Sequence, residues 1–377
     1  MKILGKRLNY LSIQMGHGVP SKAYHASVLR TGYEQIIPYR TSDLFAYTAK
    51  QDGKVVSVTD HGIVVQYDDG TKKSIETGRR YGLAEGAVIP HRVVANVKEG
   101  QRLKRGDLVS YHPDFFEQDP MNPGHVVWKT SLTVTVALME NMFTHEDASA
   151  ISRELADQLT TETTVVRGVV VNFDQSISRL AKVGQEVDVE DVLCVVEDPS
   201  THAGKFFDDA SLDTLRVLQS HVPTAKSRGT IEKIEIHYRG DKSDMSESLR
   251  QMANQQDRLL NAKYKALHRT VHTAEVDTDF RLDGEALMPD TAVIQFYITT
   301  ELPSRIGDKA VFGNQMKTIF SEVMEKPVST ESGKTVDVIF GYKSVADRIV
   351  SNVDVIGTTT VLLEEAQRRF LKAYRGK

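Results

Sequence analysis

A single cysteine occurs in the 377 residues, Cys194, which excludes an intramolecular disulfide framework and a zinc site built from several thiolates. Because it lies in the apolar run 192–196, we expect a buried, unreactive thiol in a reducing compartment. The sequence also lacks an apolar run of membrane-spanning length, and its first residues lack the apolar core of a signal peptide. These absences predict a cytoplasmic protein without membrane contact.

The chain has no large excess of charge of either sign. It contains 47 Lys and Arg against 51 Asp and Glu, a formal net charge of -4. This balance argues against a whole-chain electrostatic grip on nucleic acid, so any such contact must be local or shared with partner chains. With 26% charged and 40% hydrophobic residues, the composition is that of a soluble globular protein, and the length suggests two or three domains.

Short runs of β-branched residues dominate the pattern. The stretch 54–67 contains two such runs separated by a glycine-containing turn and predicts a hairpin. Further strands are predicted at 132–139, 293–299 and 334–340. The sequence therefore predicts an α+β, β-rich protein.

Three stretches have apolar residues at helical spacing. The first follows Thr144, the second runs from Asp244 to about Val271 and suggests a projecting arm packed on one side, and the third spans 360–377. The apolar stripes expected to face inward in the first and third are Ala148, Ile151, Leu155 and Leu159, and Leu362, Leu363, Ala366 and Phe370.

Two segments, 97–109 and 182–193, share one pattern. In each, a Gly-Gln turn is followed by alternating residues and by an aspartate before an apolar strand. The pattern resembles the hammerhead turn of barrel-sandwich hybrid folds such as lipoyl carriers. Neither segment has the Met-Lys pair that those carriers modify, so both are interpreted as structural barrel edges. They do not recur at a repeating period, so a repeat protein is not predicted.

Two lysines are candidate phosphate ligands. The stretch 306–317 follows the strand at 293–299 and contains Lys309 and Lys317, together with glycines that allow a tight turn. The structural alternative is a polar loop with solvated lysines. An acidic pair, Glu146 and Asp147, follows the strand at 132–139, and capping of a helix alone also explains it.

Four patches resemble, in order and spacing, the β subunit of multisubunit DNA-dependent RNA polymerases. They are the Ala-Lys-x-x-Gly hairpin at 49–55, the Glu-Asp turn at 145–148, the Gly-Asp-Lys loop with its second lysine, and the Val-Asp-Val-Ile strand at 335–339 that leads to Arg348. The resemblance covers roughly residues 20–355. Because the family's large lobes have no counterpart here, it is that of a split β subunit, as in the polymerases of giant bacteriophages.

The resemblance implies a fold and a division of the chain. A double-psi β-barrel is expected, with a barrel-sandwich hybrid, a flap-like β insert, a helical arm and a C-terminal helix. The expected parts are an N-terminal segment (1–50), a hybrid-barrel β domain (51–130), double-psi barrel parts (131–160 and 290–355), a flap-like insert with the arm (161–289) and the helix (356–377).

It also implies roles. Lys309 and Lys317 would contact the phosphate at the RNA 3′ end or the initiating nucleotide. Arg348 and Lys22 would contact the incoming triphosphate. Glu146 and Asp147 would lie near the second metal. The chain has no Asp-Phe-Asp-Gly-Asp element, so Mg2+ would be held mainly by a β′-like partner, and activity would need that partner, the remaining β fragments, DNA template, RNA and nucleoside triphosphates.

A second interpretation is a non-catalytic scaffold. A structural or carrier-type β-barrel protein also accounts for the hammerhead edges. It requires no partner that carries the magnesium aspartates, and this difference separates the two interpretations.

Overall fold

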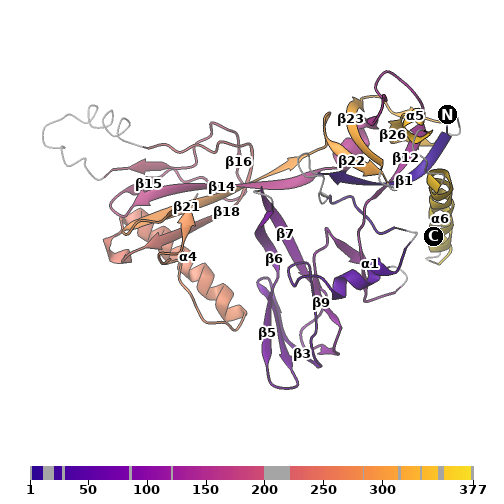
Figure 1. Ribbon diagram of the computed structural model, residues 1–377. Helices are drawn as coiled ribbons and strands as arrows, with labels where there is room; N and C mark the ends of the chain where they lie inside the picture. Colours follow the sequence, from indigo (N-terminus) through magenta and orange to yellow (C-terminus); the bar gives the residue numbers. More distant parts are fainter. Residues whose placement is uncertain are drawn as a thin grey trace.

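The computed structural model shows a β-rich chain with a few helices, arranged as three lobes (Figure 1). It confirms the predicted α+β, β-rich class. The part of the chain that the structure describes comprises residues 2–11, 21–27, 30–84, 87–119, 122–198, 221–282, 284–312, 316–331, 333–346 and 352–374. None of the helices in these ranges is long and apolar enough to cross a membrane.

One lobe is a closed six-stranded barrel. Its strands, in order around the barrel, are β1 (Lys2–Leu11), β12 (Leu132–Leu138), β26 (Val338–Phe340), β13 (Ala148–Ser152), β23 (Met316–Met324) and β22 (Lys309–Phe312). The pairs β12–β26 and β13–β23 are parallel and the others antiparallel. The barrel thus joins strands from three distant parts of the sequence, including the N-terminal segment.

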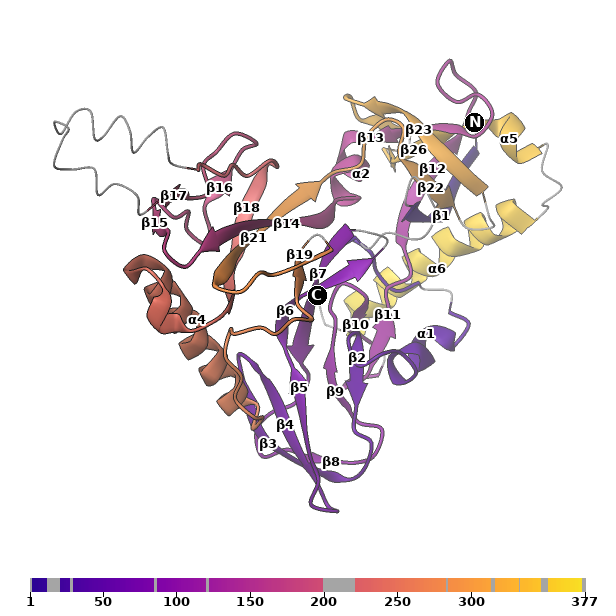
Figure 2. The same cartoon turned by 60° about the vertical axis from the view of Figure 1, so that its left-hand side comes forward.

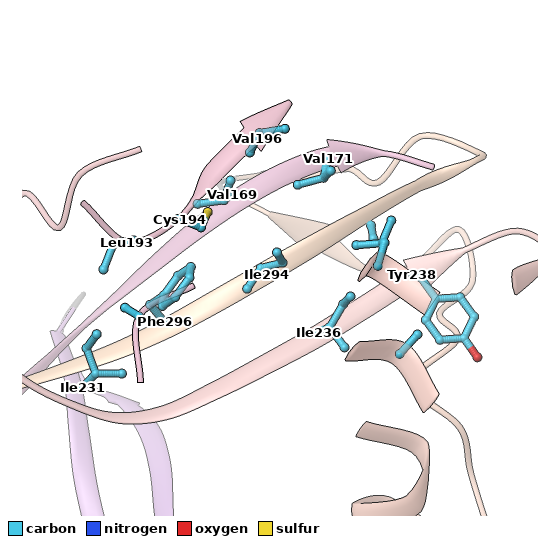
Figure 3. Close-up of a cluster of buried hydrophobic side chains, with 14 of the residues drawn as sticks. Val169, Val171, Leu193, Cys194, Val196, Ile231, Ile236, Tyr238, Ile294 and Phe296 are labelled. Carbon is cyan, nitrogen blue, oxygen red and sulfur yellow. The ribbon is translucent and has the colours of Figure 1, made fainter. Parts of the chain in front are cut away.

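The second lobe contains most of an eight-stranded sheet. Its strands are β16 (Glu186–Val187), β18 (Gly229–Arg239), β21 (Thr291–Leu302), β14 (Thr161–Asn172), β7 (Ala87–Ala95), β9 (Leu108–Tyr111) and β2 (Ala46–Thr48), with β6 (Gly78–Ala84) beside β7. Apolar side chains of β14, β21 and β18 form a core that includes Cys194 (Figure 3). Burial raises the pKa of the Cys194 thiol to about 11, which confirms the expected buried thiol.

The third lobe ends in a four-stranded sheet, in the order β5 (Lys72–Glu76), β4 (Gly62–Tyr67), β3 (Gly53–Thr59) and β8 (Arg102–Leu103). The hairpin predicted at 54–67 is therefore confirmed as β3–β4. Four two-stranded ribbons complete the described strands: β10 (Phe116–Gln118) with β11 (Val126–Trp128), β15 (Ser176–Ser178) with β17 (Val195–Glu197), β19 (Arg281–Leu282) with β20 (Glu285–Ala286), and β24 (Val328–Ser329) with β25 (Thr335–Val336).

The two Gly-Gln turns form the same structure. The side-chain oxygen of Gln101 accepts the amide hydrogen of Lys98 at 3.0 Å, and that of Gln185 accepts the amide hydrogen of Lys182 at 3.1 Å. A second turn begins three residues after each glutamine. In this turn the carboxylate of Asp107 accepts the amide hydrogen of Lys104, and in the other copy the carboxylate of Asp191 accepts that of Asp188. The shared sequence pattern therefore reflects a shared backbone.

Each turn also docks on an equivalent strand. The amide of Val55 donates to the carbonyl of Gln101 (2.9 Å), and the amide of Ile231 donates to the carbonyl of Gln185 (2.9 Å). Each strand has a bulge directly after this residue, and each follows the sequence Thr-Ala-Lys-x-x-Gly, at 48–53 and 224–229. We call residues 48–58 with 97–109 the first edge unit, and residues 181–193 with 224–234 the second.

The two units are structurally equivalent, and the pattern shared by 97–109 and 182–193 predicts their turns but not the strands on which those turns dock. In the first unit the strand precedes the turn along the chain, whereas in the second it follows the turn. A search for a fixed period misses two copies whose parts occur in opposite order.

The predicted helix after Thr144 is wrong in its first half. Residues Ala148–Ser152 are strand β13, paired with β23 and β26 inside the barrel. The helix α2 (Arg153–Gln158) begins only after Ser152, whose hydroxyl oxygen accepts the amide hydrogen of Leu155 at 3.1 Å. Pairing on both sides of β13 overrides the helical spacing of its apolar residues.

The helix α4 (Glu247–Ala266) is shorter than predicted and is not a free arm. Asp244 belongs to the short 3-10 helix η3 (Lys242–Asp244), and the N-cap of α4 is Ser246. After its last turn, the carbonyl of Leu267 accepts the Ser74 hydroxyl, and Arg269 pairs with Glu76 at 2.5 Å. The helix therefore connects the second lobe to the four-stranded sheet of the third, as Figure 2 shows.

The C-terminal helix α6 (Asn352–Tyr374) packs against β1, but not through the predicted stripe. Leu362 is 66% exposed and Phe370 53% exposed, so the prediction that these side chains face inward is wrong. The buried positions in its described part are instead the small residues Gly357 and Thr360, because close contact with a strand favours them. The remaining helical segments within the described ranges are α1 (Tyr33–Ile36), η1 (Ile37–Tyr39) and α5 (Tyr342–Ala346).

Candidate functional site

Lys309 and Lys317 lie on two adjacent strands of the barrel rather than on a loop. A tight turn leads into β22: the carboxylate of Asp308 accepts the amide hydrogen of Arg305 at 2.8 Å, and Gly307 has a φ of 92°, which favours glycine. Lys309 is the first residue of β22, and Lys317 is the second of β23. The Gly-Asp-Lys sequence therefore positions a strand end.

Both lysines belong to the outer face of the barrel. Lys309 pairs with Ile319, and Val311 pairs with Lys317, so the two lysines are diagonal neighbours across β22–β23. Diagonal neighbours on one face of an antiparallel pair are about 7–8 Å apart. The alternate residues of both strands, Ala310, Phe312, Met316, Thr318 and Phe320, are buried inside. Lys317 is exposed and Lys309 half-buried, so two cations lie close together at this surface.

The acidic pair lies against the same strand. The carbonyl oxygen of Asp147 accepts the amide hydrogen of Ile319 at 3.0 Å and the hydroxyl hydrogen of Thr318 at 2.8 Å. Ala148, the next residue, pairs with Ile319 on the same side of β23, and Lys309 pairs with Ile319 on the opposite side. Lys309, Ile319 and Ala148 therefore form one rung across β22, β23 and β13. The structure thus brings the two lysines and the acidic pair together.

Glu146 and Asp147 are exposed residues of a turn, not of a helix. Glu146 has a φ of 53°, which is unusual for a residue with a side chain, and its carbonyl oxygen accepts the hydroxyl of Ser344. The structural alternative of helix capping is therefore wrong for this pair. Its backbone is instead held between β23 and α5.

A buried hydroxyl group and a carboxylate hold the loop that precedes the acidic pair. Thr144 is fully buried, donates to the carbonyl of Met139 at 3.1 Å and accepts the amide hydrogen of Asn141 at 2.9 Å. The carboxylate of Glu140 accepts the amide hydrogen of Lys343 at 2.7 Å, at the start of α5. The loop is thus fastened to the segment that leads toward Arg348, although Arg348 itself lies outside the described residues.

Lys22 belongs to a different cluster. Its ammonium group pairs with Glu162 of β14 and, at 3.0 Å, with Glu301 of β21; Arg79 also pairs with Glu162, at 2.9 Å. The hydrogen bond to Glu162 raises the pKa of Lys22. Lys22 also lines a small cleft with Ser21, Ile89, Pro90, Asp114, Thr160, Thr161 and Glu162. Its contacts are thus with the large sheet rather than with β22 or β23.

The described residues do not offer a complete metal site. Nowhere among them do three or more His, Cys, Asp or Glu side chains converge as metal ligands. Glu146 and Asp147 supply two carboxylates at most, so the residues described here do not by themselves fit a resident Mg2+.

Sequence reasoning missed the hydroxyl groups that support the site. Thr318 alternates with the outward Lys317 and Ile319 on β23, and further along the strand Ser321 donates to the carbonyl of Phe143 in the loop. The only available signal was the position of Thr318 between Lys317 and an apolar residue, which does not by itself indicate burial.

Comparison with known proteins supports part of the resemblance. Over 137 residues the chain is 30% identical to the DNA-directed RNA polymerase subunit beta of two strains of Thermus thermophilus. The matched stretch covers 36% of this chain but only 11% of each relative. No family model matches the chain. The chain is thus similar to a bacterial polymerase β subunit over a limited stretch.

Proposed function

We propose that the chain is a β-subunit fragment of a multisubunit DNA-directed RNA polymerase. The observation that carries the proposal is the meeting of Lys309, Lys317 and the Glu146–Asp147 turn on neighbouring strands of one closed barrel. The similarity to the Thermus β subunit points in the same direction. On this proposal the six-stranded barrel is a double-psi β-barrel, and it acts only in the assembled enzyme.

The chemistry assigned to the lysines is positioning by charge. Two cations fixed on adjacent strands hold the phosphate of the RNA 3′ end or of the initiating nucleotide, and neither needs to transfer a proton. Arg348 contacts the incoming triphosphate in this proposal. Lys22 takes part only if it leaves Glu162 and Glu301, which now neutralise it.

Metal chemistry is assigned to a partner chain. A β′-like subunit holds most of the Mg2+ ligands, and Glu146 and Asp147 approach the second ion through water. The other partners are the remaining β fragments, DNA template and RNA. In the split arrangement of a giant bacteriophage, the enzyme works in the host cytoplasm or is carried in the virion.

Co-purification with neighbouring gene products tests this function. The chain is expressed with the products of adjacent reading frames, isolated through a tag on this chain, and assayed for nucleoside triphosphate incorporation with and without Mg2+. A complex with Mg2+-dependent transcription supports the proposal. A chain that purifies without partners, or a complex without activity whose partners lack an Asp-rich metal site, favours the scaffold interpretation.

A further inference from the structure

The two edge units have the same backbone hydrogen bonds, but the first has cations at positions where the second has acidic or neutral residues. We propose that the first unit binds the phosphate backbone of nucleic acid, independently of base sequence, through a surface that we call the basic edge. Its residues are Lys54, Arg102, Lys104 and Arg105 of the first unit, together with Lys72 of strand β5 in the same sheet. The basic edge lies at the tip of the third lobe, where β3, β4, β5 and β8 meet (Figure 2), and is separate from the lysines of the barrel.

The sheet register aligns three of these cations. Lys54 of β3 pairs with Arg102 of β8 and with Gln66 of β4, and Gln66 pairs with Lys72 of β5. Directly paired residues point to the same face, and neighbouring strands are about 4.8 Å apart. Four exposed polar side chains, three of them cationic, therefore form a row across the whole sheet.

The adjoining turn adds two more cations. Lys104 and Arg105 are exposed and lie in a turn in which Asp107 accepts the amide hydrogen of Lys104 at 2.8 Å. Arg102 is partly neutralised by Asp68, at 2.6 Å, and Asp52 accepts the main-chain amide of Arg105. The other four cations make no ion pair with any residue of the described ranges, so their charge is available to a ligand.

The second edge unit shows that the fold does not require these cations. It has Thr230, Glu186, Asp188 and Val189 where the first has Lys54, Arg102, Lys104 and Arg105. The comparison ends there, because Thr299 and Thr164, which continue the row, are buried and bond to each other, unlike the exposed Gln66 and Lys72. Because the backbone hydrogen bonds are the same in both units, the basic residues are specific to the first. The basic residues of the first unit are therefore better explained by a binding function than by a requirement of the fold.

Nucleic acid fits this surface better than an acidic protein does. Within residues 37–111, the described part has no exposed large apolar side chain, and Tyr47 and Tyr67 are buried. Protein interfaces usually need such an apolar or aromatic anchor, whereas phosphates need only spaced cations. With a net chain charge of -4, we expect weak, salt-dependent binding in the range of roughly 10⁻⁴ to 10⁻⁶ M.

An exchange between the two edge units tests the proposal on the full chain. Arg102→Glu with Lys104→Asp copies two residues of the second unit into the first. The control, Lys326→Glu with Lys334→Glu, makes the same change in net charge at exposed residues beside the β24–β25 ribbon. Fluorescence anisotropy measures binding to labelled DNA of about 20 nucleotides, duplex and single-stranded, between roughly 50 and 200 mM salt.

The exchange should weaken binding at least about tenfold and flatten the slope of log K against log salt by about 2, while the control changes neither as much. The two DNA arms show which form the surface prefers. Equal losses in both variants, an unchanged affinity in the exchange variant, or equal competition by polyglutamate would overturn the proposal. If thermal melting shows that the exchange variant is unfolded, Arg102→Gln with Lys104→Gln replaces it. Transcription is not measured, so the result is independent of the proposed polymerase function.

Discussion

The hydroxyl of Thr318 donates a 2.8 Å hydrogen bond to the main-chain carbonyl of Asp147. Thr318 is buried in β23 directly beside Lys317, whose side chain is on the opposite, outer face. One strand therefore presents a cation to solvent and, one residue later, fastens the acidic turn from within. The relative position of Lys317 and the acidic pair is set by the barrel wall.

The two lysines should matter for nucleotide addition but not for folding. Lys309→Ala or Lys317→Ala removes a cation near the developing phosphate charge, and loss of one such contact typically costs about 10²-fold in rate. Single-turnover nucleotide addition by the assembled complex measures the effect. Lys326→Ala is the control, because Lys326 is an exposed lysine outside the β22–β23 face. Equal elongation rates for the lysine variants and the unmodified complex would contradict this role.

Thr318→Val should disturb the acidic turn without filling or emptying space. The substitution keeps the shape of the side chain but leaves the buried Ser149 hydroxyl, 2.7 Å away, without this partner, while the Asp147 carbonyl keeps only the amide hydrogen of Ile319. An unpaired buried polar group costs about 1–3 kcal/mol. We expect lower thermal stability of the barrel and slower nucleotide addition, whereas Thr318→Ser, which retains the hydroxyl, should restore the rate. A rate unaffected by Thr318→Val would show that the turn does not need this contact.

The strands of the barrel were easier to predict than the residues that close it. Alternation in 132–139 indicates a strand because one face is buried, and the structure contains the barrel strand β12 there. The run 293–299 is likewise a strand, β21, although it belongs to the eight-stranded sheet. Ala148 to Ser152 was assigned to a helix because its apolar spacing fits both structures, and only long-range pairing with β23 decides between them. The meeting of Lys309 with the acidic turn depends on that same pairing, so local sequence contains no direct signal for it.

Acid should weaken the packing around His112. This side chain is 1% exposed, and its two ring nitrogens face the main-chain amides of Arg92 and Asp114, so the neutral ring accepts a hydrogen bond from one of them at the nitrogen that carries no proton. Burial, together with the nearby His91 and Lys129, lowers the pKa of His112 from its ordinary 6.5 to about 4, even though a carboxylate oxygen of Asp114 lies 3.8 Å away. The folded protein therefore favours the neutral ring.

The folded protein should lose stability as the pH falls. The unfolded chain takes up a proton below pH 6.5 and the folded chain only near pH 4, so this contribution to stability is complete above pH 6.5 and declines as the pH falls toward 4. At pH 5 the loss should be about 2 kcal/mol. Urea unfolding at several pH values measures it. His112→Gln keeps an acceptor but does not titrate, so the free energy of unfolding of this variant should change less between pH 6.5 and pH 4. An identical pH dependence in both proteins would assign the effect to other groups.

The duplicated edge units predict two separable losses of stability. A Cβ at Gly53 would lie 2.5 Å from the carbonyl oxygen of Gln66, and a Cβ at Gly229 would lie 2.5 Å from that of Thr299. Each glycine thus permits the same close approach of two strands, and alanine there should cost about 1–3 kcal/mol through forced backbone shifts. Gly70→Ala is the control, because Gly70 has a φ of 87° but open space around its Cα, so it reports the cost of conformation alone.

Hydrogen exchange can locate the two losses. Gly53→Ala should speed amide exchange in β3 and β4 of the third lobe, and Gly229→Ala should do so in β18 and β21, because the two glycines belong to different sheets. Helix α4 connects these sheets through Glu76, which pairs with Lys263 at 3.0 Å and with Arg269. If each alanine variant loosened both sheets equally, the units would unfold as one body, and this helix would be the element that couples them.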